Sequence, residues 1–101
     1  MRFENINIRK IVSVALSKNA IIVDVRDVER FRKGHIPMAV HVPLEKIEQG
    51  QVHLPRNRTL IVYCDTGVGS IRAAKRLSDE GYQVINCVGG LKNYNASLTK
   101  G

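Results

Sequence analysis

The chain has 101 residues, of which 44% are hydrophobic and 25% are charged, and this balance predicts one small globular domain over residues 1–101. The composition excludes an intrinsically disordered chain, and the length leaves no room for a second hydrophobic core. Sixteen Lys and Arg against nine Asp and Glu give a formal net charge of +7, which favours anionic binding partners.

No apolar run approaches the roughly 20 residues that are needed to cross a bilayer, so no membrane partner is expected. Residues 1–10 lack the continuous apolar core of a secretion signal, and we therefore expect a cytoplasmic protein. The basic residues are scattered, and no aromatic side chains interleave with them to stack bases. The basic surface is therefore interpreted as a solvated face, and nucleic acid is not expected as a partner.

The first third of the chain predicts two helices around one strand. Apolar residues three and four apart predict a helix over residues 8–16, which Asn19 ends in the left-handed conformation. The short apolar run over residues 20–25, rich in β-branched residues, is typical of a strand that is buried on both faces. Asp27 is expected to cap a short helix that Gly34 ends.

The middle of the chain predicts a short strand over residues 39–42, a short helix over residues 44–49 and a polar loop over residues 51–58. Residues 59–64 then form a second strongly apolar run, which predicts another buried strand.

The last third predicts a helix that is capped by Ser70 and ended by Gly81, a buried strand over residues 83–88, and a final helix over residues 91–98. Strands that alternate with helices along the chain favour an α/β fold, in which a parallel sheet is covered by helices on both faces.

Cys64 ends the second buried strand, at the edge where open α/β sheets place their ligand sites. Two glycines in the loop that follows let the backbone curl so that successive N–H groups point inward, and the next helix adds the partial positive charge of its N-terminus. Such a nest favours the thiolate, the nucleophilic form of cysteine, although a cysteine at a strand end is more often a packing residue. The candidate loop residues are Asp65, Thr66, Gly67, Val68, Gly69 and Ser70.

Cys64 and Cys87 do not make a disulfide framework, and we expect two free thiols, although one bridge is conceivable. Cys87 lies within a predicted strand and is interpreted as a packing residue. His35, His41 and His53 lack the spacing of zinc ligands, so no metal site is predicted.

Three segments within residues 5–98 together resemble the signatures of the rhodanese family. They are Ile22-Val-Asp-Val-Arg26 followed by Phe31 and Gly34-His-Ile-Pro37, then Tyr63-Cys64-x-x-Gly67-x-x-Ser70, and finally Gly89-Gly90-Leu91 with Tyr94. The resemblance implies a rhodanese-like three-layer α/β fold, in which a five-stranded parallel sheet is flanked by helices.

The resemblance also implies a sulfurtransferase that moves a sulfane sulfur from thiosulfate or a persulfide donor to a thiol or cyanide acceptor. The sulfur would be carried as a persulfide on Cys64, within the N–H groups of residues 65–70. It implies no cofactor and no metal. The donor would be a small anion, and an acidic sulfur-relay protein would fit the basic surface as a further partner.

Two loop residues depart from the family pattern. Gly69 stands where the family often has Arg, and Asp65 places a negative charge beside the nucleophile. Both favour the alternative of a rhodanese-like interaction or regulatory module with little turnover. A third interpretation, a phosphatase or arsenate reductase of the same fold, requires a longer loop that ends in Arg.

Two further expectations concern residues near the first buried strand. Asp24 and Arg26 are expected to form a structural ion pair near the strand end. His35 is expected to hydrogen-bond the turn backbone, whereas His41 and His53 are expected to have surface or packing roles.

Overall fold

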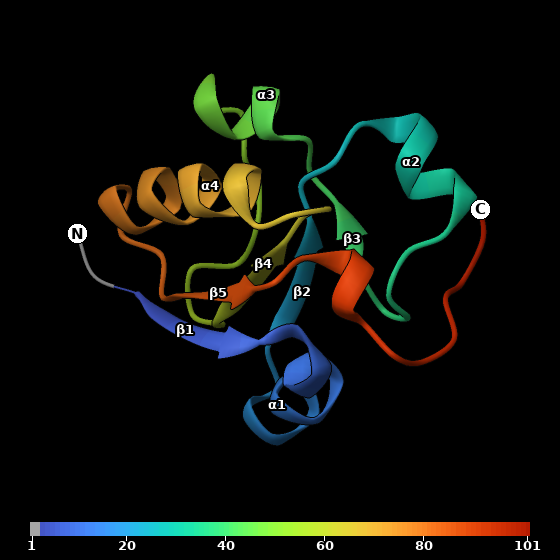
Figure 1. Ribbon diagram of the computed structural model, residues 1–101. Coiled ribbons are helices and arrows are strands. Elements are labelled where there is room, and N and C mark those ends of the chain that lie inside the picture. Colours follow the sequence, from blue (N-terminus) through green and yellow to red (C-terminus); the bar gives the residue numbers. More distant parts are fainter. Residues whose placement is uncertain (1–2) are drawn as a thin grey trace.

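The computed structural model describes residues 3–101 and is built on one parallel sheet with the strand order β1-β5-β4-β2-β3 (Figure 1). The strands are β1 (Glu4–Asn7), β2 (Ile21–Asp24), β3 (Val40–His41), β4 (Leu60–Tyr63) and β5 (Val84–Val88). The five-stranded parallel sheet flanked by helices that the resemblance implies is therefore confirmed.

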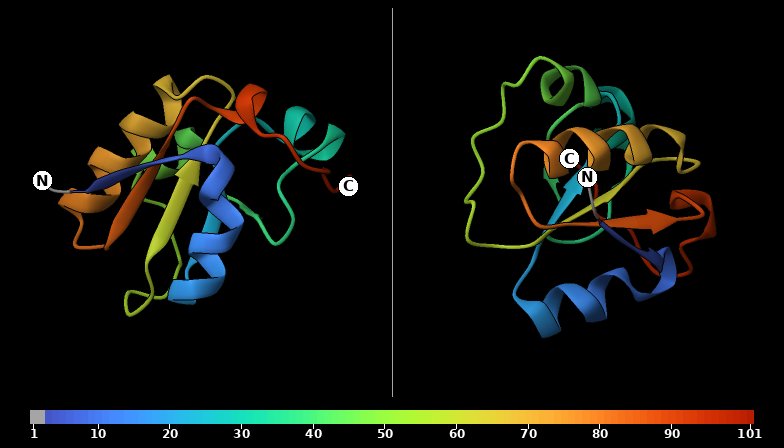
Figure 2. Two further views of the ribbon diagram at one scale, coloured as in Figure 1. Left: turned by 60° about the horizontal axis from the view of Figure 1, so that its bottom comes forward. Right: turned by 90° about the vertical axis from the view of Figure 1, so that its left-hand side faces the viewer.

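The helices cover both faces of this sheet, with α1 on one face and α4 on the other (Figure 2). They are η1 (Ile8–Lys10), α1 (Ile11–Lys18), α2 (Val28–Lys33), α3 (Leu44–Glu48), α4 (Val68–Asp79) and η2 (Leu91–Asn93), where η denotes a 3-10 helix. Within residues 3–101, none of them is long and apolar enough to cross a membrane.

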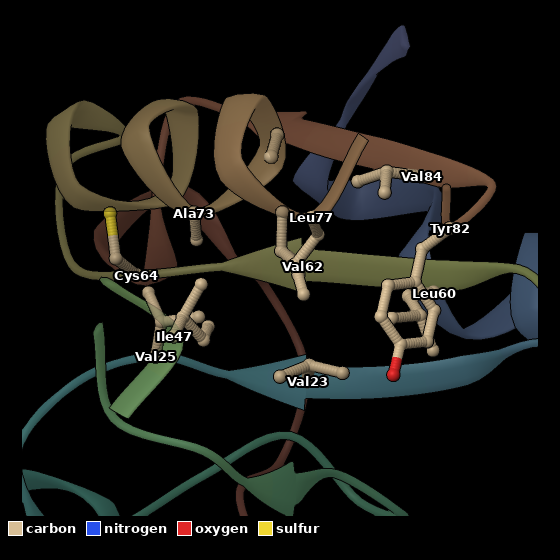
Figure 3. Packing of buried hydrophobic residues seen from close by; sticks show 11 residues of the cluster. Val23, Val25, Ile47, Leu60, Val62, Cys64, Ala73, Leu77, Tyr82 and Val84 are labelled. Atoms are coloured by element: carbon tan, nitrogen blue, oxygen red, sulfur yellow. The ribbon is translucent and has the colours of Figure 1, made fainter. Parts of the chain in front are cut away.

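Successive residues of β4 point to opposite faces, as strand geometry requires. Leu60, Val62 and the following Cys64 pack in the core beneath α3 and α4 (Figure 3), whereas Ile61 and Tyr63 pack in the core that faces α1. This alternation brings the Cys64 side chain to the α4 face at the carboxyl end of the central strand.

The predicted caps of α1 and α2 are confirmed. Asn19 ends α1 with a φ of 53°, and the Asp27 side chain accepts a hydrogen bond from the N–H of Arg30 at the start of α2. Gly34 follows the last residue of α2, as expected. The predicted apolar stripe of the first helix is wrong at Leu16, which is exposed.

Two elements differ from the sequence-based prediction. Strand β1 is not predicted by the pattern, because Ile6 is its single apolar residue and it pairs on one side only, with β5. The predicted helix over residues 91–98 is wrong, because only η2 forms. Beyond it, Thr99 exchanges two backbone hydrogen bonds of 2.8 Å with His35, and this pairing draws the chain away from a helical path.

Candidate active site

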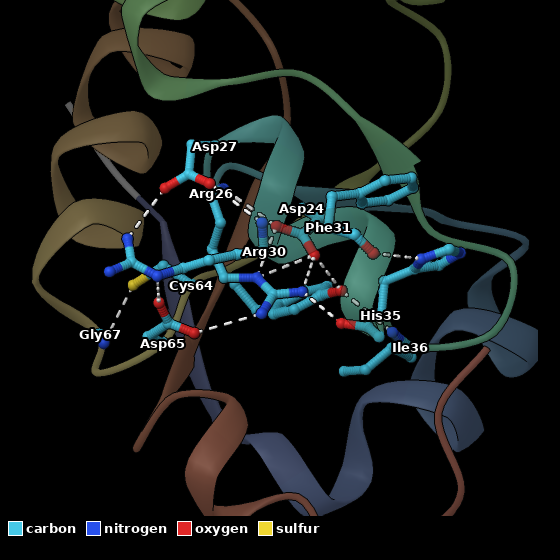
Figure 4. Close-up of polar contacts among 12 residues, drawn as sticks. Asp24, Arg26, Asp27, Arg30, Phe31, His35, Ile36, Cys64, Asp65 and Gly67 are labelled. Atoms are coloured by element: carbon cyan, nitrogen blue, oxygen red, sulfur yellow. Dashed lines mark hydrogen bonds and ion pairs between the residues drawn. The ribbon is translucent and has the colours of Figure 1, made fainter. Parts of the chain in front are cut away.

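The sulfur of Cys64 lies at the centre of the loop that connects β4 to α4. The backbone N–H of Gly67 donates to Sγ at 3.0 Å (Figure 4), and the N–H of Ser70 donates to it at 3.2 Å. Cys64 is 6% exposed, so these bonds form in a place that is largely shielded from water. Two N–H groups that converge on one sulfur stabilise negative charge on it.

The loop reaches this geometry because glycine occupies two demanding backbone positions. Gly67 precedes α4 with a φ of 102°, a left-handed conformation that residues with a Cβ rarely adopt. Gly90 lies directly against the loop backbone, and a Cβ there would overlap the carbonyl oxygen of Asp65. The N–H of Leu91 also donates to the Cys64 carbonyl at 2.8 Å, which fixes the turn after β5 against the loop.

The prediction that Ser70 caps the helix is wrong. Helix α4 begins at Val68, and Gly67 occupies the cap position. Because Ser70 lies inside the first turn, its N–H is free to reach the sulfur, and its hydroxyl donates to the Gly67 carbonyl at 3.2 Å.

Gly69 faces the sulfur from the first turn of α4. A Cβ at this position would lie 3.8 Å from Sγ of Cys64 and 3.8 Å from Cδ2 of Leu44, which are ordinary van der Waals contacts. Position 69 would therefore accept a Cβ without strain.

The Asp65 carboxylate forms ion pairs with two arginines (Figure 4). Oδ1 lies 3.2 Å from Nη1 of Arg26, and Oδ2 lies 3.4 Å from Nε of Arg30. The negative charge that the sequence places beside the nucleophile is thus paired with two guanidiniums, which also pair with Asp24 and Asp27. This reduces the repulsion that a free Asp65 would exert on an anion at the sulfur.

Arg26 is held by a buried polar network, and its predicted ion pair with Asp24 is confirmed. Nη2 of Arg26 lies 2.8 Å from Asp24 and 2.6 Å from the Gly34 carbonyl, and the Tyr63 hydroxyl donates to Asp24 at 2.5 Å. Burial disfavours the charged form of Arg26. The hydrogen bond and the negative charge of Asp24 have the larger combined effect, so the pKa of Arg26 is raised. Arg26 therefore remains a permanent cation beneath the loop.

Arg30 is a candidate functional residue that was not among those predicted from the sequence. Its Nη1 lies 2.9 Å from Asp27, and its Nε contacts Asp65, so its exposed guanidinium is held beside the Cys64 loop. The backbone N–H of Arg30 lowers the pKa of Asp27, which keeps this carboxylate charged. The spacing of Asp27 and Arg30 at the start of a helix is the signal in the sequence that indicates such a pair.

Two histidines contact the backbone beside this network. Nδ1 of His35 lies 2.9 Å from the Phe31 carbonyl, so the ring contacts backbone as expected, but the partner lies in α2 rather than in the turn. Nε2 of His41 lies 2.6 Å from the Arg26 carbonyl, and its ring stacks on Phe31. His41 therefore fixes the backbone of Arg26, a contact that its sequence context does not indicate.

Cys87 and Cys64 are both free thiols, but they lie in different surroundings. Cys87 is fully buried in the core that faces α1, as its predicted packing role requires. Burial, followed by the charge of the Cys64 sulfur, raises the pKa of Cys87 to about 12. Cys87 is thus an unreactive thiol at neutral pH. Residues 3–101 contain no cluster of His, Cys, Asp or Glu that is arranged to hold a metal ion.

Comparison with known proteins identifies the same family in sequence and in structure. The family model described as "Rhodanese-like domain" matches residues 10–97. The Bacillus subtilis protein YrkF, named as a sulfur carrier, is 36% identical over 74 residues, which are 72% of this chain and 40% of YrkF. The thiosulfate sulfurtransferase GlpE of Coxiella burnetii is 25% identical over 97 residues, which are 95% of this chain and 91% of GlpE.

A solved structure of similar size also matches. The rhodanese homologue TT1651 of Thermus thermophilus superposes with a TM-score of 0.74 at 36% identity, covering 88% of this chain and 98% of TT1651. This chain therefore spans less than half of YrkF but nearly all of TT1651.

Proposed function

The chain belongs to the rhodanese-like domain family, and from this premise we propose that it transfers a sulfane sulfur through a persulfide on Cys64. The names of its relatives, a sulfur carrier and a thiosulfate sulfurtransferase, support sulfur transfer as the general activity. We also propose that residues 1–101 form a single domain.

The reaction has two steps. The Cys64 thiolate attacks the outer sulfur of thiosulfate or of a persulfide donor, an S–S bond forms, and sulfite or the donor thiolate leaves with the bonding electrons. A thiolate or cyanide then attacks the outer sulfur of the Cys64 persulfide. That S–S bond breaks, Cys64 leaves as a thiolate, and the acceptor carries the sulfur away as a persulfide or as thiocyanate.

The single observation that carries this proposal is the pair of hydrogen bonds from Gly67 and Ser70 to Sγ of Cys64. Both steps leave negative charge on sulfur, and these preorganised N–H groups stabilise that charge without reorganisation. The other four loop residues of the proposed substrate site, Asp65, Thr66, Val68 and Gly69, frame this cradle.

Arg30 reduces the negative charge that an anionic donor would meet at this site. Its exposed guanidinium pairs with Asp27 and Asp65 beside the loop, and it enters from α2 rather than from position 69 of the loop. The pairing of Asp65 with Arg26 and Arg30 also weakens one of the two reasons for the alternative of an interaction module with little turnover, because Asp65 does not stand as a free charge beside the sulfur.

The test is intact mass spectrometry after incubation with thiosulfate or with an organic persulfide, together with an assay of thiocyanate formation. We expect the protein and Cys87→Ser to gain the mass of one sulfur atom, and Cys64→Ser to gain none. Failure of every donor to load the protein, or full thiocyanate formation by Cys64→Ser, would contradict the proposal.

A further inference from the structure

A hollow of about 310 Å³ lies at the edge of the sheet, between the end of α1 and the start of β3. Strand β3 forms this edge beside β2 (Figure 1), and it pairs only with Val23 and Asp24. The preceding residues of β2, Ile21 and Ile22, pair with β4 but not with β3, and both line the hollow. The hollow therefore borders a place where β2 lacks a strand on one side.

Three large apolar side chains at this hollow are exposed to solvent. Leu16 is 67% exposed, Met38 is 57% exposed and Val40 is 39% exposed, and all three line the hollow. They come from α1, from the turn before β3 and from β3 itself. Single exposed apolar residues are common on protein surfaces, but apolar side chains that converge on one hollow are typical of an interaction site.

The backbone of Met38 adds a second observation. Its φ of 73° lies in the left-handed region, which residues with a Cβ rarely adopt and which glycine adopts without strain. Because more than half of the side chain is exposed, core packing offsets little of this strain. An exposed methionine adapts its shape to the side chains of a partner. This residue is therefore better explained by binding than by stability.

Arg58 supplies the charge of the hollow. Its Nε donates to the Asn19 carbonyl at 3.0 Å and its Nη2 donates to Oδ1 of Asn19 at 3.4 Å, which holds the guanidinium in place and leaves Nη1 for a ligand. Within residues 3–101, Arg58 pairs with no carboxylate, and it is the one charged residue that lines the hollow. A fixed cation beside exposed aliphatic side chains is complementary to a carboxylate that adjoins an aliphatic group.

We propose that this hollow docks an extended segment of a partner protein in which Asp or Glu adjoins aliphatic residues. The carboxylate binds Arg58, and the aliphatic side chains pack on Leu16 and Met38. An extended segment fits because polypeptide chains bind along open sheet edges. The formal net charge of +7 opposes a second copy of this chain as the occupant.

The hollow lies at the opposite end of the sheet from the candidate nucleophile. Asn19 and Arg58 come before β2 and β4, whereas Cys64 follows β4, and these two strands are parallel. A docked segment therefore leaves the Cys64 loop accessible. Docking does not depend on the proposed sulfur transfer, and Cys64→Ser is expected to bind such a segment as tightly as the wild type does.

The test selects peptides from a random phage-displayed library on the immobilised full chain. Enriched peptides are expected to carry Asp or Glu beside aliphatic residues, and fluorescence polarisation of synthetic copies gives their Kd. Arg58→Gln is expected to weaken binding about tenfold, the worth of one charge-assisted hydrogen bond, and Arg58→Lys less. Arg32→Gln, at an exposed arginine of α2, is the matched control that keeps the wild-type affinity. Absence of enrichment, or equal binding by Arg58→Gln, would overturn the inference.

Met38→Gly separates a binding role from a structural one. Glycine adopts the left-handed backbone without strain, so the thermal midpoint of unfolding is expected to equal or exceed that of the wild type. The affinity for the selected peptides is expected to fall about fourfold, the worth of one buried methylene group. A lower midpoint with unchanged affinity would show that the Met38 side chain serves the fold, which contradicts the proposal.

Octanoate tests a different occupant, an aliphatic carboxylate that has no peptide backbone. It is expected to displace the selected peptides only at concentrations far above their Kd. Displacement at a concentration below that Kd would identify the hollow as a site for a free aliphatic acid and would overturn the docking of a protein segment.

Discussion

Oδ1 of Asp65 lies 3.2 Å from Nη1 of Arg26, which ties the residue after the candidate nucleophile to a buried guanidinium. The same guanidinium binds Asp24 at the end of β2 and the carbonyl of Gly34 after α2. One side chain thus connects the loop, the sheet and a helix. The position of the loop is therefore coupled to the position of α2, which carries Arg30.

The first prediction concerns Arg30. Arg30→Ala is expected to lower kcat/KM for thiosulfate about fivefold, because Asp27 and Asp65 lose their shared cation and repel an anionic donor more strongly. Arg32→Ala, an exposed arginine of the same helix, is the matched control. Initial rates of thiocyanate formation at low and high salt measure both variants. An equal loss in Arg32→Ala would indicate a general effect of net charge instead.

A second prediction concerns position 69. Gly69→Arg is expected to raise kcat/KM for thiosulfate about threefold, because position 69 accepts a Cβ without strain and the new side chain adds a cation. Gly67→Ala is the contrasting variant, since its backbone φ of 102° disfavours any Cβ, and it should lose activity. Initial rates of thiocyanate formation measure both variants. A rate for Gly69→Arg below that of the wild type would show that position 69 does not face the donor.

A third prediction tests the buried network. Tyr63→Phe removes the hydroxyl that donates to Asp24 and accepts from the N–H of Ile36, leaving both groups buried with one partner fewer. The free energy of unfolding is expected to fall by about 1–3 kcal/mol. Urea denaturation measures the change, and Tyr94→Phe, at a tyrosine outside the network, is the control. Equal stability of the two variants would contradict the assigned role of the network.

A fourth prediction follows from the pKa of Cys87. Burial raises this pKa from about 9 in the unfolded chain to about 12 in the fold, so the folded state holds the thiol proton more tightly. The stabilisation is fully present below pH 9 and is lost between pH 9 and 12, by up to about 1.4 kcal/mol per pH unit.

The measurement is the pH dependence of urea denaturation in the wild type and in Cys87→Ala. Other groups titrate in both proteins, so the difference between the two curves isolates the thiol. We expect the wild type to lose stability faster than Cys87→Ala above pH 9. Parallel curves over this range would refute the assignment of the raised pKa.

The central sheet could be predicted from the sequence because β2, β4 and β5 are mostly apolar and are buried between helices. Strand β1 could not, since an edge strand with one apolar residue is defined by backbone pairing with β5 rather than by a hydrophobic pattern. The final helix fails for a related reason, because the backbone bonds between Thr99 and His35 are non-local.

The loop as a candidate site could also be predicted, since a cysteine, a glycine and a helix start are local features. The electrostatic surroundings of the loop could not be predicted in this way. The charge of Asp65 alone indicates repulsion, whereas its partners Arg26 and Arg30 lie 39 and 35 positions away in the sequence and meet it only through the fold. The hollow at Arg58 likewise joins α1, β2 and the start of β3.

The two sulfur atoms of the chain's cysteines are separated by the sheet itself, because Cys64 belongs to the core beneath α4 and Cys87 to the core that faces α1. Because the sheet lies between the two thiols, a sulfur carried on Cys64, as proposed, would meet no second thiol within the same molecule. Its transfer would then require an encounter with another molecule, and the concentration of that acceptor would set the rate.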